Sequence, residues 1–227
     1  MATKKSTTVT INAPEFEVVK FKIVGDTPLI VHAWDEKAKR MMLDKQMGKA
    51  AKTKHEIKVP VNDFINSLYW LTEKPENGID DADAQRNFDE AIENGARFGF
   101  SIGGIKQSFI TGAKRAGADV VMTELRGSFF LEGATDVSTF DFAEIVGPAP
   151  VMREDMVKVG GMSKTADIRY RGEFKEWEIP LNMRINKNGK YSPQQILHCV
   201  TLGGFATGIG EWRPERDGQY GMYHIEI

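Results

Sequence analysis

The stretch that organises this chain runs from Gly203 to Tyr223 and reads GGFATGIGEWRPERDGQYGMY. It holds six glycines, and glycine is used where the backbone takes a positive φ or passes close to another group. A helix-like segment, 193–200, precedes it, and an alternating, strand-like segment, 220–227, follows it. We therefore expect a tight turn between the last helix and the last strand.

Two interpretations of this turn are open. In the first, its main-chain amides and the guanidinium groups of Arg213 and Arg216 hold a phosphate backbone. In the second, it is a structural turn with solvated arginines, because glycine patterns often match by chance. The acids Glu211, Glu215 and Asp217 lie in the same turn and offer Arg213 an ion-pair partner.

Composition predicts one elaborated soluble domain over 1–227, since 41% of its residues are hydrophobic and 27% are charged. The net charge of −2 gives no overall signal for nucleic acid or membrane, so any basic surface must be local. The only cysteine, Cys199, excludes an intrachain disulfide and favours a reducing, cytoplasmic setting. No apolar run approaches the ~20 residues that span a bilayer, and the polar start of the chain is expected to be a frayed tail. We expect no cofactor and no metal.

The order of segments predicts an α+β fold. Strands outnumber helices and no βα unit repeats, which favours an antiparallel sheet with helices on one face. Ser192 and Gln195 form a capping-box pattern at the start of the last helix. A ferredoxin-like (RRM-like) core with large insertions would use strand 16–25, helix 105–116, strand 128–133, a further strand, helix 193–202 and strand 220–227.

Two segments are predicted to be insertions. The first, 34–58, is a basic helical insertion, which either faces an anionic partner or is the solvated face of an amphipathic helix. The second, 73–97, is an acidic loop insertion on the surface. Its carboxylates do not match the spacing of an EF-hand loop, so we do not expect it to bind a metal.

Basic and aromatic residues alternate between 164 and 184. In a strand, Arg169 and Arg171 point to the same face. Cations that share a face with rings are typical of surfaces that bind single-stranded nucleic acid. The alternative is that Phe174 and Trp177 belong to the core and that the arginines pair with neighbouring glutamates.

A glycine turn also precedes the helix at 105–116. Gly103 and Gly104 lead into this helix, which carries Lys106. The spacing of a P-loop is absent, so the sequence excludes a nucleoside-triphosphatase of that kind.

The C-terminal pattern resembles the glycine-rich loop of the RAMP superfamily, the ferredoxin-like RNA-binding subunits of CRISPR systems. The resemblance rests on helix 193–202 followed by Gly208-Ile209-Gly210, Arg213, Gly218, Tyr220-Gly221 and Tyr223. It covers about 30 residues, and the stretch 102–116 looks like the first helix of those proteins. The form Gly-Ile-Gly-Glu-Trp-Arg-Pro also looks like a phage and prophage branch.

This resemblance implies a non-catalytic protein that binds single-stranded RNA or DNA, with RNA favoured, and that forms a homo-oligomer along the strand. It would act in the cytoplasm of a bacterial host and be phage-encoded. The residues expected to contact nucleic acid are Gly208, Gly210, Trp212, Arg213, Arg216, Gly218, Tyr220, Gly221, Arg169, Tyr170, Arg171, Lys164 and Lys106.

Two other functions are open. A metal-independent endoribonuclease of the RAMP type needs a histidine near the phosphate, and His32 is the best candidate for it. His198 lies in an apolar helical run and is expected to be packed. A phage structural or assembly protein would instead use the Met-rich basic helix at 34–54 to dock on a neighbour.

Overall fold

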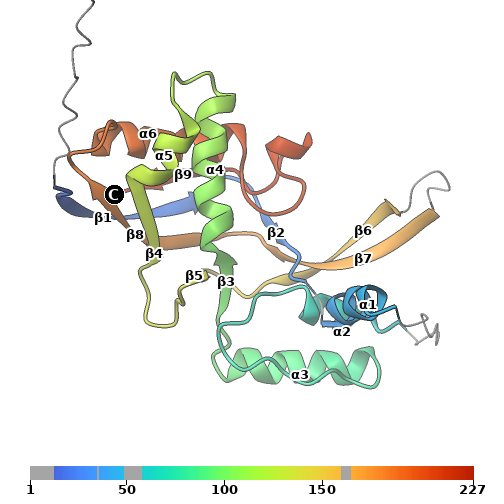
Figure 1. The fold of residues 1–227 in the computed structure, drawn as a ribbon. Coiled ribbons are helices and arrows are strands. Elements are labelled where there is room, and N and C mark those ends of the chain that lie inside the picture. The colour runs from blue at the N-terminus through green and yellow to red at the C-terminus, as the bar shows by residue number, and fades with distance from the viewer. Residues whose placement is uncertain (1–12, 35, 49–57, 160–164) are drawn as a thin grey trace, which may run out of the picture.

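The computed structural model describes residues 13–34, 36–48, 58–159 and 165–227. Its elements (Figure 1) are, in chain order, β1 (Phe16–Gly25), β2 (Leu29–Val31), α1 (Glu36–Gln46), α2 (Pro60–Asn66), α3 (Asp81–Glu93), β3 (Phe98–Ser101), α4 (Ile102–Arg115), α5 (Met122–Ser128), β4 (Phe129–Gly133), β5 (Phe142–Ile145), β6 (Val151–Val159), β7 (Thr165–Phe174), β8 (Glu178–Asn186), α6 (Pro193–Ala206), the 3₁₀ turn η1 (Pro214–Arg216) and β9 (Tyr223–Glu226).

The strands form three antiparallel groups. The largest is a four-stranded sheet in the order β4-β8-β1-β9, and the others are β2-β7-β6 and the pair β3-β5. The predicted α+β class with antiparallel pairing is therefore confirmed. The six segments predicted for the core are observed as β1, α4, β4, β8, α6 and β9, in that order along the chain. The four strands form the largest sheet.

The four-stranded sheet buries one face and leaves the other open. Side chains alternate between the faces of a strand, and Phe21 opposite Leu181 and Phe129 opposite Ile185 all lie on the buried face. Helices α4 and α6 pack against each other over this face. The opposite face carries the exposed residues of β1, β4 and β8 and is called the open face below.

The helix pair is held to β9 by a buried tyrosine. Ser108 Oγ on α4 lies 2.8 Å from Tyr223 Oη, and the Phe109 ring packs edge-on to the Tyr223 ring. Burial raises the pKa of the Tyr223 phenol far above its ordinary value. Gly112 and Gly203 meet where α4 crosses α6, because a Cβ on either residue would collide with the other helix.

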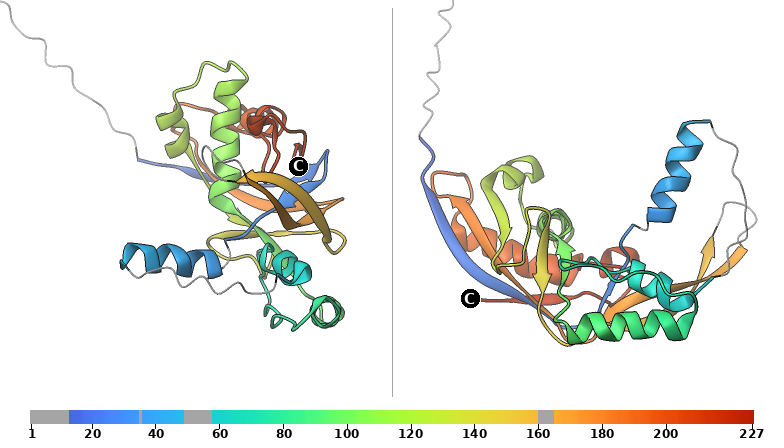
Figure 2. Two further views of the ribbon diagram at one scale, coloured as in Figure 1. Left: turned by 90° about the vertical axis from the view of Figure 1, so that its right-hand side faces the viewer. Right: turned by 90° about the horizontal axis from the view of Figure 1, so that it is seen from below.

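The second sheet projects from the body of the molecule. Strands β6 and β7 pair over their whole length, and Figures 1 and 2 show them extending away from the four-stranded sheet. Strand β2 pairs with the base of this hairpin at Val31 opposite Gly172. Helices α2 and α3 lie on the same side of the molecule as the hairpin (Figure 1).

The sequence predicts an acidic loop over 73–97. The structure differs, because this segment contains the helix α3. The Asp80 side chain caps this helix by accepting a hydrogen bond from the Asp83 amide at 2.8 Å. Ala84 and Phe88, four residues apart, are buried on one side of it. In the sequence, the acids and turn residues around it obscure this apolar spacing.

The other boundaries differ in smaller ways. The capping box at Ser192 and Gln195 is present, but α6 continues through Gly203 and Gly204 because both pack closely against Tyr223. In the basic insertion 34–58, residues 36–46 form α1, while 49–57 lie outside the described residues. Within the described ranges, no helix is both long and apolar enough to cross a membrane.

Candidate nucleic-acid interface

The predicted glycine-dense turn is a loop between α6 and β9, residues 207–222, which is tied to itself and to β2. The Ile209 amide donates to the Gly221 carbonyl at 2.9 Å. The Glu211 amide donates to the Ile30 carbonyl at 2.9 Å, and the Gly221 amide donates to the Pro28 carbonyl at 2.8 Å. The loop is therefore a fixed part of the molecule.

Two glycines allow the close contacts within this loop. Gly210 has φ 78°, and a Cβ there would collide with the Ile30 carbonyl. A Cβ at Gly218 would collide with main-chain atoms of Trp212. These glycines serve the packing of the loop against β2 and against itself.

The sequence predicts that amides of the loop bind phosphate, but in the structure three of them donate to carbonyls of the chain. The amides of Gly208, Gly218 and Gly221 donate to the carbonyls of Gly203, Arg213 and Pro28. Because they are already bonded within the chain, these three amides are not available to a ligand. The side chains of the loop are therefore better placed than these three amides to contact nucleic acid.

The two arginines of the loop are placed differently. Arg213 donates to Glu215 Oε2 from Nη2 at 2.6 Å and to the Gly210 carbonyl from Nη1 at 2.8 Å. The ion pair that the sequence suggested for Arg213 is thus present, and its guanidinium holds the loop. Arg216 is exposed, and no carboxylate of the described residues lies within ion-pair distance of it.

Trp212 has an unusual backbone. Its φ is 52°, in the left-handed region that bulky residues rarely adopt. Its side chain is 41% exposed. The Tyr220 amide bonds to the Trp212 carbonyl at 3.1 Å, and Gly218 leaves room for that conformation. The loop therefore holds a strained backbone that presents an indole to solvent.

Beneath the loop lies a polar and charged cluster, which we call the loop–hairpin junction: His32, Arg153, Asp155, Arg171, Glu211 and Tyr220. Asp155 and Arg171 are buried, and the other four residues are half-buried. Arg171 is only 3% exposed and donates from Nη1 to Asp155 Oδ2 at 3.0 Å. Its Nε donates to His32 Nδ1 at 3.0 Å, and its Nη2 lies 3.7 Å from Glu211 Oε2. The Arg171 guanidinium is enclosed by these partners, an arrangement that does not favour the predicted contact with nucleic acid, which stays a prediction.

Tyr220 is part of the same cluster. The guanidinium of Arg153 stacks 4.6 Å from the centroid of the Tyr220 ring and donates to its hydroxyl at 3.2 Å. Arg153 also bonds to Asp155 and Glu173. One face of the Tyr220 ring is thus occupied by a cation from the chain itself. No sequence pattern points to Arg153 or Asp155, because partners of both residues lie on other segments.

The remaining predicted contacts are spread over the molecule. Arg169 and Tyr170 lie half-buried on β7, where Lys58 Nζ sits 5.4 Å from the centroid of the Tyr170 ring. Phe174 and Trp177 are core residues, as the alternative interpretation held. Lys164 lies outside the described residues.

Lys106 does not extend a basic track from the loop. Its ammonium donates to the main-chain carbonyls of Arg126 and Phe129 at 2.8 and 2.7 Å, and so caps the end of α5. Burial lowers the pKa of Lys106 below its ordinary value. A lysine that is bonded to two carbonyls is a structural residue in this arrangement.

The candidate catalyst His32 is half-buried in the junction. Its Nδ1 accepts from Arg171, and its carbonyl accepts from the Tyr69 hydroxyl at 3.4 Å. Burial, and then Glu211, raise the pKa of Tyr69. His198, expected to be packed, is exposed, because it falls outside the buried stripe of Ile196, Cys199 and Val200 on α6.

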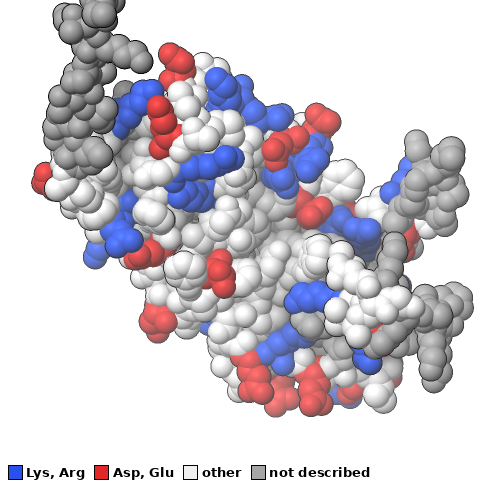
Figure 3. Space-filling view, viewed as in Figure 1, with Lys and Arg blue, Asp and Glu red and all other residues white. Residues whose placement is uncertain are grey.

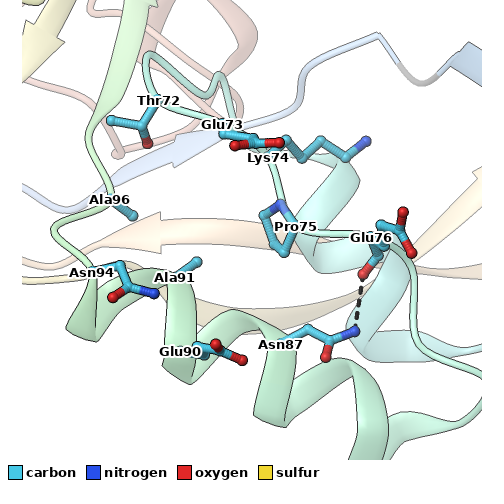
Figure 4. A pocket seen from close by; sticks show the side chains of 10 residues that line it. All are labelled: Thr72, Glu73, Lys74, Pro75, Glu76, Asn87, Glu90, Ala91, Asn94 and Ala96. Carbon is cyan, nitrogen blue, oxygen red and sulfur yellow. Dashed lines mark hydrogen bonds between the residues drawn. The ribbon is translucent and has the colours of Figure 1, made fainter.

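A separate hollow of about 550 Å³ lies between α3 and the segment before it. Figure 4 shows that Glu73, Glu76 and Glu90 line it together with Lys74. Acidic side chains also gather over α3 in the space-filling view (Figure 3), whereas basic and acidic residues are mixed elsewhere on that face. This hollow does not suit a phosphate backbone, and no group of three potential metal ligands occurs in the part of the chain that the structure describes.

Comparisons with known proteins add little. No protein-family model matches the chain, and no curated protein matches it significantly. The crystal structure of Cmr6 from Pyrococcus furiosus is similar to it with a TM-score of 0.34 and 11% sequence identity, over 92% of this chain and 98% of that chain. That likeness is too weak to support a conclusion about this protein.

Proposed function

We propose that the protein binds single-stranded nucleic acid without cleaving it, and that the exposed side chains of the loop 207–222 make the contact. The single observation that supports this proposal best is Trp212. A bulky residue in the left-handed region costs about 1–3 kcal/mol, and such strain gathers at functional sites. Here it leaves an indole exposed, and an exposed aromatic ring can stack on any base.

The charges around Trp212 fit the same role. Arg216, four residues further on, is exposed and available to a phosphate. Arg213 is held by Glu215 and steadies the loop. RNA is favoured over DNA by the resemblance of this loop to the RAMP pattern. The proposal is for binding alone, since the candidate base His32 is engaged with Arg171 beneath the loop.

We also propose that several copies bind along one strand. The β6–β7 hairpin exposes apolar side chains on one face, among them Met156 at 74% and Ile168 at 42%, which pair across the hairpin. Such a surface on a projecting arm suits contact with a neighbouring copy. Light scattering should show complexes whose mass grows with the length of the strand. A constant mass on short and long strands would contradict this part of the proposal.

The test of the loop is the substitution Trp212→Gly. Glycine accepts a positive φ, and this relief of strain offsets the greater entropy of its unfolded chain, so we expect the free energy of unfolding to change by no more than about 1 kcal/mol. We expect binding of a fluorescent single-stranded oligonucleotide to weaken by about fivefold or more, which corresponds to one lost stack. A loss of stability with unchanged affinity would show that Trp212 is structural. A labelled RNA that is cut by the protein, but not by a His32→Ala variant, would favour the nuclease instead.

A further inference from the structure

The open face of the four-stranded sheet carries two exposed phenylalanines on either side of an arginine. Phe16 on β1 is 55% exposed and Phe130 on β4 is 53% exposed. The guanidinium carbon of Arg184 on β8 lies 5.5 Å from the centroid of the Phe16 ring and 5.6 Å from that of Phe130. These three side chains form a continuous row across the sheet, which we call the aromatic row.

A hollow adjoins this row on the same face. Val18 on β1 lies opposite Arg184 on β8. Two residues away on each strand, and therefore on the same face, Lys20 lies opposite Asn182. Lys20 and Asn182 help to line a hollow of about 400 Å³, together with Lys22 and Pro180. Asn182 Oδ1 is buried there and has no hydrogen-bond partner. If the side chain turns toward the hollow, this unpaired oxygen can accept a hydrogen bond from the edge of a base.

Two cations on the open face are available to a ligand. Lys22 is neutralised by Glu178 at 2.6 Å and by Glu226 at 3.1 Å. Lys20 and Arg184, in contrast, have no carboxylate within ion-pair distance among the residues that the structure describes. The end of the face that holds the aromatic row is therefore locally positive, although Glu132 lies on the same face.

We propose that the open face is a second nucleic-acid site, which binds the bases of a single strand. Phe16 and Phe130 supply rings for stacking, and Arg184 between them supplies both a planar surface and a charge. Lys106 Nζ also lies 4.8 Å from the centroid of the Phe130 ring, so a base would stack on the part of this ring that the two cations leave open. The hollow at Lys20 and Asn182 receives the next nucleotide. The ligand class rests on the proposed function, whereas the surface is separate from the loop 207–222.

A protein partner fits this face less well. A standard interface buries about 800 Å² on each partner around a core depleted of charge. Beyond the two phenylalanines and Val18, this face presents Lys20, Lys22, Glu132 and Glu226. Single-stranded nucleic acid needs only rings and a few cations.

The test compares oligo-uridine of about 12 nucleotides with an abasic oligomer of the same length, which keeps the phosphates and lacks the bases. The wild-type protein should bind oligo-uridine at least ~10-fold more tightly than the abasic strand. The double variant Phe16→Ala/Phe130→Ala should reduce this preference by about fivefold or more and keep its affinity for the abasic strand, while Trp212 maintains the remaining preference. Phe140→Ala is the matched control, since Phe140 is 94% exposed and lies outside the sheet.

If the double variant keeps the wild-type preference for oligo-uridine, the open face is not a base-binding site, while the proposed function stands. If no version of the protein binds either strand, the proposed function fails as well. If the double variant changes the mass of the free protein in light scattering but not its affinity for oligo-uridine, the face is a protein contact and the proposal is overturned. Circular dichroism checks that the variants fold, which their exposed positions favour.

Discussion

Arg171 and Asp155 form an ion pair in which both side chains are almost fully buried, with Nη1 and Oδ2 3.0 Å apart. The pair joins β7 to β6, and Arg171 also contacts His32 beside β2 and Glu211 in the loop. One guanidinium therefore ties the base of the hairpin to the segment that presents Trp212.

Replacing Arg171 should destabilise the whole protein. Arg171→Met leaves Asp155 with Arg153 as its remaining partner in a buried site, and breaking a buried pair typically costs about 3–5 kcal/mol. Arg169→Met, two residues away and partly exposed, should change the free energy of unfolding by no more than about 0.5 kcal/mol. Urea denaturation of both variants measures the difference, and equal effects would count against the structural role of the junction.

Comparison of Gly210→Ala with Gly117→Ala should distinguish the conformational cost of a positive φ from the cost of a steric collision. At Gly117, with φ 83° and open space around it, alanine meets only the conformational cost of about 1 kcal/mol. At Gly210, with φ 78°, the added methyl also collides with the Ile30 carbonyl. We expect Gly210→Ala to lower the free energy of unfolding clearly more than Gly117→Ala and to weaken nucleic-acid binding. Equal losses in thermal denaturation would mean that the loop does not pack closely on β2.

Lys106 should contribute to the pH dependence of the free energy of unfolding. Because burial lowers its pKa in the folded protein, the unfolded chain binds more protons at pH values between that lowered pKa and 10.5. The contribution of Lys106 to the free energy of unfolding therefore rises with pH in this window. Denaturation of wild type and Lys106→Met over the same pH range should show a smaller rise for the variant. The same slope in both proteins would contradict the assignment.

Arg216 should account for part of the salt dependence of binding. Each phosphate contact with a single strand contributes about 0.7 to the slope of log affinity against log salt concentration. Arg216→Gln should reduce the slope by about that amount. Lys74→Gln, a change of the same charge beside the acidic hollow, should leave it unaltered. If the two variants behave alike, Arg216 does not contact the strand.

Local signals allowed most of the fold to be predicted. The capping box at Ser192 and Gln195 depends on residues three apart, and the alternation over 16–25 reflects a strand with one buried face. Helix α3 was missed because its acids hid the spacing of Ala84 and Phe88. The continuation of α6 through Gly203 depends on contact with Tyr223, which no local pattern reveals.

The site was less predictable because its interactions join distant segments. The burial of Arg171 follows from Asp155 and from His32, which lies 139 residues away along the chain. The aromatic row depends on the register that brings Phe130 opposite Arg184. The pairing of Arg213 with Glu215 was predictable, since the two residues are neighbours in one turn.

Binding of single-stranded nucleic acid underlies both proposed sites, the loop 207–222 and the open face. Fluorescence anisotropy of a labelled single-stranded RNA and a DNA of the same sequence, titrated with the protein at low salt, tests it most directly. We expect saturable binding that is tighter for RNA, that weakens as salt is added and that Trp212→Gly reduces. No change in anisotropy for either strand at low salt would contradict it.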